Sequence, residues 1–139
     1  MKIEEQVLSR EQMAHLKELG VDTSDSSMMW YRCDDGNAER WYIQINNELS
    51  QSLARIMKGT VGCLVPTYTI GDLIEKIPKQ IGWYELSVCW KNDCIKYDNW
   101  IPEEVTDYIG DFNFEYRPLI EALYDCLCWV AENHKELIK

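Results

Sequence analysis

The segment from Pro66 to Pro78 constrains the fold most, because its residues specify the start, the buried face and the end of one short helix. Its apolar residues recur at the i, i+3, i+4 and i+7 positions of a helical face: Ile70, Leu73, Ile74 and Ile77. Thr69 and Asp72 have the spacing of a capping box, and Pro78 cannot continue a helix. Capping and burial account for this segment, which therefore predicts architecture and no catalytic or ligand-binding role.

The length and apolar content of the chain predict a single domain. With 139 residues, of which 46% are hydrophobic, one core can bury about two-thirds of the surface that the unfolded chain exposes. We therefore expect one domain over residues 1–139, in which residues 1–8 could be loose. The six cysteines show no Cys-x-x-Cys spacing and no targeting segment precedes them, which favours reduced, buried thiols in the cytoplasm over disulfides.

The charge balance of the chain argues against ordinary nucleic-acid binding. The 24 acidic and 14 basic residues give a net charge of −10, which repels a phosphate backbone. An acidic protein could instead imitate DNA toward a basic partner, although such charge is more often a solubilising surface. No stretch approaches the length of about 20 apolar residues that a membrane span requires, so we expect no membrane insertion.

Capping signals predict an N-terminal helix over residues 9–19. Ser9 and Gln12 have the Ser-x-x-Gln spacing of a capping box, and Gly20 is suited to the left-handed conformation that ends many helices. Val21 could then pack back on the last turn as in a Schellman cap. The sequence thus places both ends of this helix.

The next segments predict a β-hairpin. Residues 28–34 and 37–46 read as strands, and Asp35-Gly36 fits a two-residue turn between them. This register places Trp30 opposite Trp41 and collects the large apolar side chains on one face.

A second hairpin is predicted after the central helix, over residues 83–91 and 94–100. Asn92 and Asp93 join its strands, because both residues tolerate positive φ. In this register Cys89 and Cys94 are diagonal neighbours, which disfavours a disulfide between them.

Three further segments complete the predicted fold. Residues 47–65 read as a helix followed by an extended piece, residues 101–115 as a long acidic and aromatic surface loop, and residues 116–138 as a helix that tolerates Pro118 in its first turn. We therefore predict an α+β fold, in which two antiparallel hairpins form one sheet of about four strands. An N-terminal, a short central and a long C-terminal helix pack against this sheet.

One acidic pattern resembles the opening of a calcium loop. Asp111, Asn113 and Glu115 alternate as calcium ligands do, but a loop of EF-hand type also needs glycine at its sixth position and glutamate at its twelfth. Tyr116 and Ala122 stand at those positions. Solvated loop acids explain the pattern better, so we predict no metal site and no cofactor.

The cysteines and histidines give no catalytic signature. Cys126 and Cys128 are two residues apart on a helix and therefore point in different directions, so they cannot share one metal ion. His134 could activate a thiol only at about 3 Å, whereas Cys126 lies about 12 Å away along the helix. Cys33 or Cys63 could approach it through the fold. We predict no catalytic residue from the sequence.

One tryptophan and the aromatic residues of the predicted loop are candidate contacts for a partner. Trp129 lies opposite Ile120 on the helical wheel, so it either covers a second element or is exposed as an interface anchor. We single out Trp129, Tyr108, Phe112 and Phe114 as candidate interface residues.

Three segments carry a resemblance: Leu16–Gly20, which reads L-K-E-L-G; Pro66–Pro78, which reads P-T-Y-T-x-x-D-L-I-E-x-x-P; and Glu121-Ala122-Leu123 with Trp129. Together they resemble a loose group of small uncharacterised proteins that phages and prophages of gut bacteria encode. The resemblance spans most of the chain by order of elements and is specific over about forty residues. It implies a compact α+β protein from a mobile element, and it transfers no site residue to this sequence.

These observations favour a non-enzymatic module that binds a protein partner or associates with itself. The alternative is a small enzyme or ligand-binding protein whose Cys–His or carboxylate site forms only in the fold. A deep pocket with such a cluster would favour the alternative.

Overall fold

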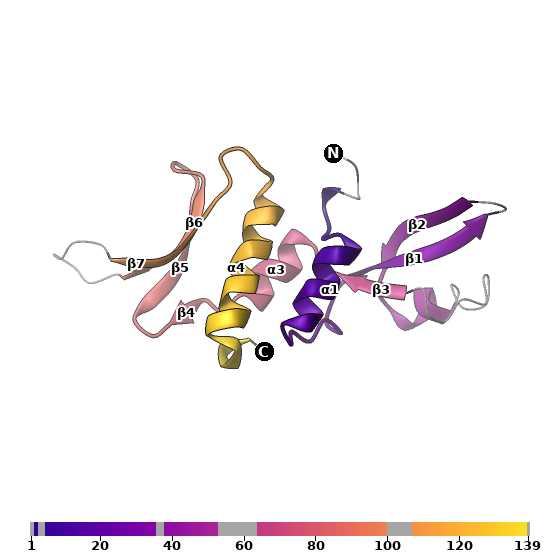
Figure 1. Ribbon diagram of the computed structural model, residues 1–139, viewed down its shortest axis with the longest axis horizontal. Coiled ribbons are helices and arrows are strands. Elements are labelled where there is room, and N and C mark those ends of the chain that lie inside the picture. Colours follow the sequence, from indigo (N-terminus) through magenta and orange to yellow (C-terminus); the bar gives the residue numbers. More distant parts are fainter. Residues whose placement is uncertain (1, 3–4, 36–37, 53–63, 100–106, 139) are drawn as a thin grey trace.

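Two antiparallel sheets lie at opposite ends of an elongated molecule, with helices between them (Figure 1). This computed structural model describes residues 2, 5–35, 38–52, 64–99 and 107–138. The predicted α+β class is confirmed. However, the two predicted hairpins belong to separate sheets of three and four strands, because each hairpin pairs with further strands of its own.

The N-terminal helix α1 (Arg10–Glu18) has the predicted caps. Ser9 Oγ accepts a hydrogen bond from the Gln12 N–H at 3.1 Å, and Gln12 Oε1 accepts one from the Ser9 N–H at 2.9 Å. Gly20 adopts the predicted left-handed conformation with φ of 89°, and the Val21 N–H donates back to the last turn at 3.0 Å. These bonds form a complete Schellman cap, as predicted.

The three-stranded sheet has the order β2-β1-β3. Its strands are β1 (Met28–Asp35), β2 (Ala38–Ile45) and β3 (Leu64–Thr67). The extended piece predicted before the central helix exists as β3 in its described part. Residues 48–52 are helical, as predicted. The rest of that predicted helix and the start of the predicted extended piece fall on residues 53–63, which lie outside the described residues.

The register of the β1–β2 hairpin differs from the prediction by two residues. Trp30 pairs with Ile43, not with Trp41, and Asp35 pairs with Ala38 at the end of the ladder. A shift of two residues keeps every side chain on its predicted face, because side chains alternate with a period of two. The face assignment is confirmed and the pairing is wrong.

The central helix α3 (Ile70–Lys76) begins and ends where the sequence predicts. Thr69 and Asp72 form the predicted capping box, and the helix ends just before Pro78. Its buried face differs in one detail, because Ile74 is 40% exposed whereas Lys76 is 8% exposed. The apolar pattern alone predicted the opposite for these two positions.

The four-stranded sheet has the order β4-β5-β6-β7. Its strands are β4 (Gln80–Ile81), β5 (Tyr84–Cys89), β6 (Cys94–Asn99) and β7 (Tyr108–Asn113). The segment predicted as a long surface loop thus contains β7, which pairs with β6. Phe112 of β7 packs against the core, and this burial explains why the segment is a strand.

The register of the β5–β6 hairpin also differs from the prediction by two residues. Val88 pairs with Ile95 and Cys89 pairs directly with Cys94, so the predicted diagonal arrangement of the two cysteines is wrong. Four residues connect the strands, and among them Asp93 has the predicted positive φ, at 49°. Trp90 lies in this turn and is 66% exposed, although its apolar character predicted a place in the strand.

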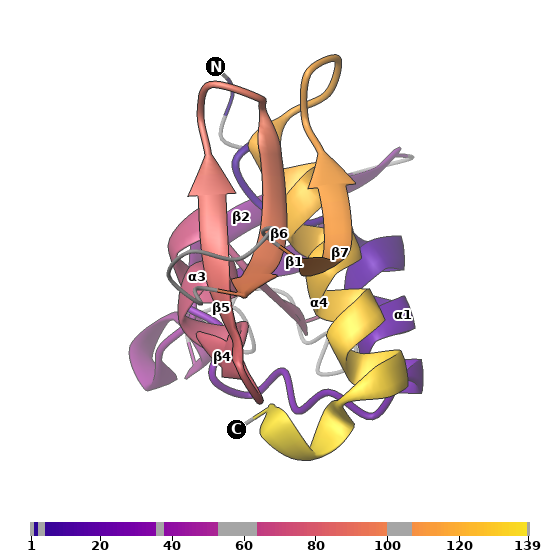
Figure 2. The same ribbon diagram turned by 90° about the vertical axis from the view of Figure 1, so that its left-hand side faces the viewer.

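The C-terminal helix α4 (Leu119–Asn133) is shorter than predicted, and the short 3-10 helix η2 (Lys135–Leu137) follows it. His134 separates the two helices with φ of −141° and ψ of 42°. Helical spacing in the sequence predicts a buried apolar stripe, and four of its positions are buried in α4: Ile120, Leu123, Leu127 and Val130. The fifth position, Leu137, lies in η2 and is 36% exposed, so the stripe ends with α4. This helix lies behind the four-stranded sheet in Figure 2 and contacts β6 and β7.

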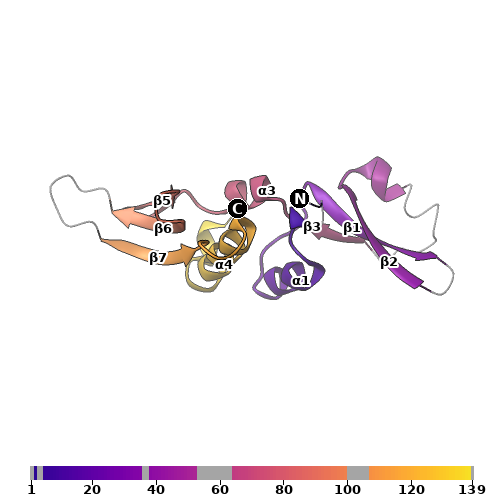
Figure 3. The same ribbon diagram turned by 90° about the horizontal axis from the view of Figure 1, so that it is seen from above.

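The main core lies between α4, α3, α1 and the inner face of the four-stranded sheet (Figure 3). Val7 and Leu8, which the sequence placed in a loose start, are buried at 6% and 0% exposure. The Leu8 N–H donates to Tyr68 O at 3.0 Å, which ties this segment to the chain just before α3. Among the described residues, we find no helix with the length and apolar character needed to cross a bilayer.

Candidate functional site

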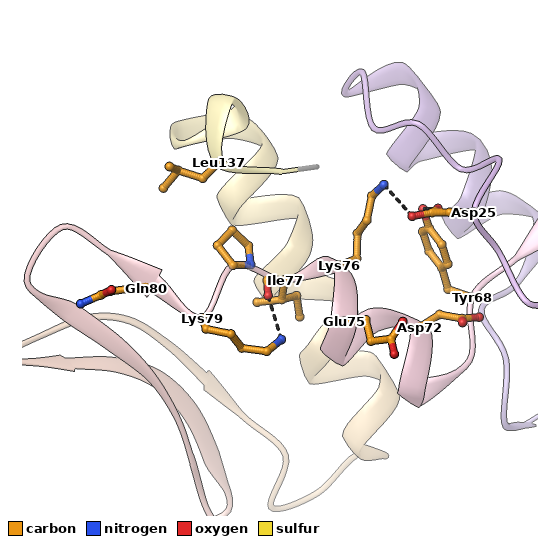
Figure 4. Close-up of a pocket in the computed structure, with 10 residues that line it drawn as sticks. Asp25, Tyr68, Asp72, Glu75, Lys76, Ile77, Lys79, Gln80 and Leu137 are labelled. Carbon is orange, nitrogen blue, oxygen red and sulfur yellow. Dashed lines mark hydrogen bonds and ion pairs between the residues drawn. The ribbon is translucent and has the colours of Figure 1, made fainter.

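A pocket of about 610 Å³ lies beside α3, between the loop that follows α1 and the C-terminal end of the chain (Figure 4). Its ionisable lining consists of Asp25, Tyr68, Asp72, Glu75, Lys76 and Lys79. Pockets of this size are large enough to bind a small molecule. The roles of these six side chains therefore determine what the pocket can do.

Lys76 is the most deeply placed charge of the pocket, and its side chain is only 4% exposed. Its ammonium lies 2.9 Å from Asp25 Oδ2, and the hydroxyl of Tyr68 lies 2.7 Å from Asp25 Oδ1 and 2.9 Å from Asp22 O. Burial raises the pKa of Tyr68, and its contact with Asp25 adds to the increase. The trio of Lys76, Asp25 and Tyr68 therefore joins α3 to the loop after α1 by charge and hydrogen bonding.

The carboxylates of the pocket do not form a catalytic pair. Asp72 Oδ2 accepts from the Thr69 N–H at 3.0 Å and from the Ser27 hydroxyl at 2.6 Å, so it caps a helix and holds a loop. Glu75 is exposed on α3. Asp25 is paired with Lys76, as described above. Asp72 and Asp25 are therefore engaged in contacts that hold α3 to the loop after α1, with the hydroxyls of Ser27 and Tyr68 among their partners.

Lys79 extends over the C-terminal end of α3. Its ammonium donates to Ile77 O at 3.1 Å and to Ile74 O, both of which are carbonyls that the helix leaves without a partner. Burial lowers the pKa of Lys79. A cation at this position is stabilised by the negative end of the helix dipole.

The described cysteines and histidines do not assemble a catalytic dyad. Burial raises the pKa of Cys126 to about 12 and that of Cys128 to about 11, so both thiols stay protonated and unreactive. His134 packs on Trp129, with 5.4 Å between ring centroids. Within the described ranges, no three His, Cys, Asp or Glu side chains are grouped as metal ligands. The predicted approach of Cys33 or Cys63 concerns side chains outside those that the structure describes.

The four candidate interface residues lie in different surroundings. Trp129 is half-buried and covers the four-stranded sheet, with ring centroids 5.9 Å from Phe112 and 6.0 Å from Tyr97. The structure thus places Trp129 over a second element, which is one of the two arrangements that the sequence left open. Tyr108 is 48% exposed on β7, and Phe114 is half-buried against Trp90 at 5.7 Å.

A more exposed aromatic group lies where the β5–β6 turn meets the connection from β7 to α4. We call Trp90, Phe114 and Tyr116 the aromatic tip; Trp90 is 66% exposed and Tyr116 is 91% exposed. The Phe114 N–H donates to Asp93 O at 2.7 Å, so the turn and the connection are held side by side. The sequence analysis missed Trp90 and Tyr116. The nearby turn signal at Asp93 could have placed Trp90 outside the strand.

Comparison of the chain with models of protein families, with curated protein sequences and with solved structures gave no match. The geometry of the described residues is therefore the basis for any functional assignment.

Proposed function

We propose that this chain is a non-enzymatic protein-interaction module of the phage or prophage type, whose aromatic tip anchors a partner protein with a basic surface. The observation that carries the proposal is the exposure of Trp90 and Tyr116, at 66% and 91%. Tryptophan and tyrosine are enriched among the residues that dominate binding energies at protein interfaces. The resemblance of three segments to phage and prophage proteins is the ground for the proposed origin.

The charge of the chain supports a basic partner. The net charge of −10 attracts a positively charged surface and accelerates encounter with it at low salt. The segments that carry the aromatic tip hold two acidic residues, Asp93 and Glu115, and one basic residue, Lys91. The positive charge of Arg117 is neutralised by its ion pair with Asp125. The tip therefore combines apolar anchors with an acidic surround.

The test compares the tip with a tryptophan elsewhere on the surface. Trp83 is 83% exposed and precedes β5 at the other end of that strand, so Trp83→Ala is the matched control. Wild-type protein, the Trp83→Ala variant and a Trp90→Ala/Tyr116→Ala variant are immobilised, and proteins captured from a bacterial host extract are identified. A partner of the tip is retained by the first two proteins and lost with the third.

The captured partner is then purified and titrated against each variant by calorimetry. We expect Trp90→Ala to weaken binding by about 2 kcal/mol and added salt to weaken it further. Equal capture by the tip variant and by wild type, or binding that salt strengthens, would contradict the proposal. Light scattering of the protein alone shows whether a second copy is the partner.

The pocket beside α3 supports a second candidate function, the binding of a small polar molecule. The observation in its favour is the volume of about 610 Å³ around the nearly buried Lys76. Leu137 lines the pocket and is 36% exposed, so Leu137→Trp should fill it without entering the core. Saturation-transfer NMR with a library of polar metabolites should detect ligands that this variant no longer binds. Absence of any ligand, or equal signals from both proteins, would exclude this candidate.

A further inference from the structure

Two cysteines face each other across adjacent strands at the end of the β5–β6 hairpin. Cys89 ends β5 and Cys94 begins β6, and the two are direct partners in the antiparallel register. Directly opposed residues project their side chains to the same side of a sheet. Both thiols therefore lie on the outer face, because their neighbours Val88 and Ile95 pack toward the core.

The backbone geometry of this pair suits a disulfide. Direct partners in an antiparallel ladder have Cα atoms about 4.5 Å or about 5.5 Å apart, according to their hydrogen bonding. Disulfides bridge Cα atoms that are about 4.4–6.8 Å apart. Either kind of pair thus permits a bond without movement of the strands. Both thiols are free in the structure.

The two thiols differ in access to solvent. Cys94 is 7% exposed, and burial, together with the nearby carboxylate of Asp111, raises the pKa of its thiol. Cys89 lies on β5 and is half-buried, and the outer neighbour β4 pairs only with Tyr84 and Glu85, whereas Cys94 is paired with Asn113 of β7 on its other side. A reagent in solution can reach Cys89 more readily than Cys94.

We propose that Cys89 and Cys94 form a dithiol–disulfide pair, which a low-molecular-weight disulfide such as glutathione disulfide oxidises. The Cys89 thiolate attacks one sulfur of the reagent, a mixed disulfide forms at Cys89, and one reagent thiolate leaves. The Cys94 thiolate then attacks Cys89 Sγ and displaces the second reagent thiolate. Two cysteine thiols are oxidised to one disulfide, and the reagent disulfide is reduced to two thiols.

This bond closes the turn that carries Trp90, since residues 90–93 connect the two cysteines. The cross-link restricts the unfolded chain and thus stabilises the hairpin against opening. The inference goes beyond the proposed binding function and stands without it, because its test requires no partner.

Trypsin makes the bond directly observable. Lys91 lies between the cysteines, so cleavage separates peptide 80–91 with Cys89 from peptide 92–96 with Cys94. After folded wild-type protein is incubated with glutathione disulfide and remaining thiols are blocked, we expect mass spectrometry to detect these two peptides as one linked species. A reductant should abolish it. The oxidised protein should also melt at a higher temperature than the reduced protein.

Two single variants test the order of the steps. In Cys94→Ser, the mixed disulfide with glutathione should accumulate on Cys89, because no second thiol displaces it. In Cys89→Ser, Cys94 should stay unmodified under the same conditions. The proposal is overturned if wild type, folded by circular dichroism, yields no linked peptides, or if Cys89 and Cys94 link mainly to other cysteines. Equal glutathione adducts in the two variants overturn the order of attack.

Discussion

The two sheets of this protein are held in different ways. The four-stranded sheet is covered on its inner face by α4, and its residues Ile95 and Tyr97 are completely buried. Among the described residues of β1 and β2, none belongs to the main core cluster. The β1–β2 hairpin meets the rest of the molecule through β3 and a few specific contacts, such as the Trp30 indole N–H donating to Leu8 O at 2.9 Å.

This difference indicates which region contributes most to the free energy of unfolding. Burial of apolar surface is the dominant favourable contribution to folding, so the α4 side carries most of it. The β1–β2 hairpin leaves Tyr42 40% and Ile45 61% exposed, so local opening should begin there. Substitutions in the two regions and at their junction, together with alkaline pH, test this division between a covered sheet and a sparsely covered one.

The largest effect is expected at α3, which joins the two ends. Leu73 is completely buried, so Leu73→Asp would place an unpaired charge in the core. Burial of such a charge costs at least as much free energy as the typical stability of about 5–15 kcal/mol provides. We therefore expect the variant to unfold, as seen by circular dichroism. Ile74→Asp is the adjacent control, because Ile74 is 40% exposed and should tolerate a charge. A Leu73→Asp protein with wild-type melting temperature would refute the role of this helix.

A milder pair of substitutions compares the two sheets directly. Leu127 is completely buried on α4, whereas Ile45 ends β2 and is 61% exposed. Leu127→Ala should lower the free energy of unfolding by about 2–5 kcal/mol, and Ile45→Ala by about 0.5 kcal/mol or less. Urea denaturation measures both. Similar losses at the two sites would show that the β1–β2 hairpin contributes to the core as much as α4 does.

Local features of the fold were predictable, because they depend on residues close together in the sequence. The capping boxes at Ser9 and Thr69 and the left-handed Gly20 appear as predicted. The faces of both hairpins were also predictable, since alternation sets which side each residue takes. Alternation does not distinguish registers that differ by two residues, and both predicted registers were wrong by that amount.

Features that depend on distant residues were not predictable. The division into two sheets depends on β3 and β7 joining different hairpins, which no local pattern specifies. Lys76 is buried because Asp25, 51 residues away, supplies its counter-charge. Trp90 is exposed because the turn begins earlier than its apolar neighbours suggest. The pocket beside α3 and the aromatic tip follow from these long-range arrangements, so the sequence alone did not reveal them.

Alkaline pH should lower stability in part through a buried thiol of α4. Burial raises the pKa of Cys126 from an ordinary value of 9.0 to about 12. Above about pH 9 the unfolded chain loses this proton and the folded chain keeps it, so stability falls by about 1.4 kcal/mol per pH unit up to about pH 12. The stabilising effect is fully present below pH 9. Cys126→Ala should therefore show a shallower loss of stability between pH 9 and pH 11 in urea titrations, and an unchanged slope would contradict this assignment.

The smallest expected effect concerns the caps of α1 and α3, which meet where the two ends of the molecule join. Ser9→Ala and Thr69→Ala should each cost about 1 kcal/mol, because each leaves a helix N–H without its acceptor. The residues before the two helices are tied together, since Val7 forms a β-bridge with Thr69 and the Leu8 N–H donates to Tyr68 O at 3.0 Å. Loosening one cap should therefore weaken the support of the other, so the double variant should lose less stability than the two single losses added together. Urea denaturation of all four proteins measures this coupling. Strict additivity would mean that the two helices are capped independently, and that the junction between the sheets does not depend on this bridge.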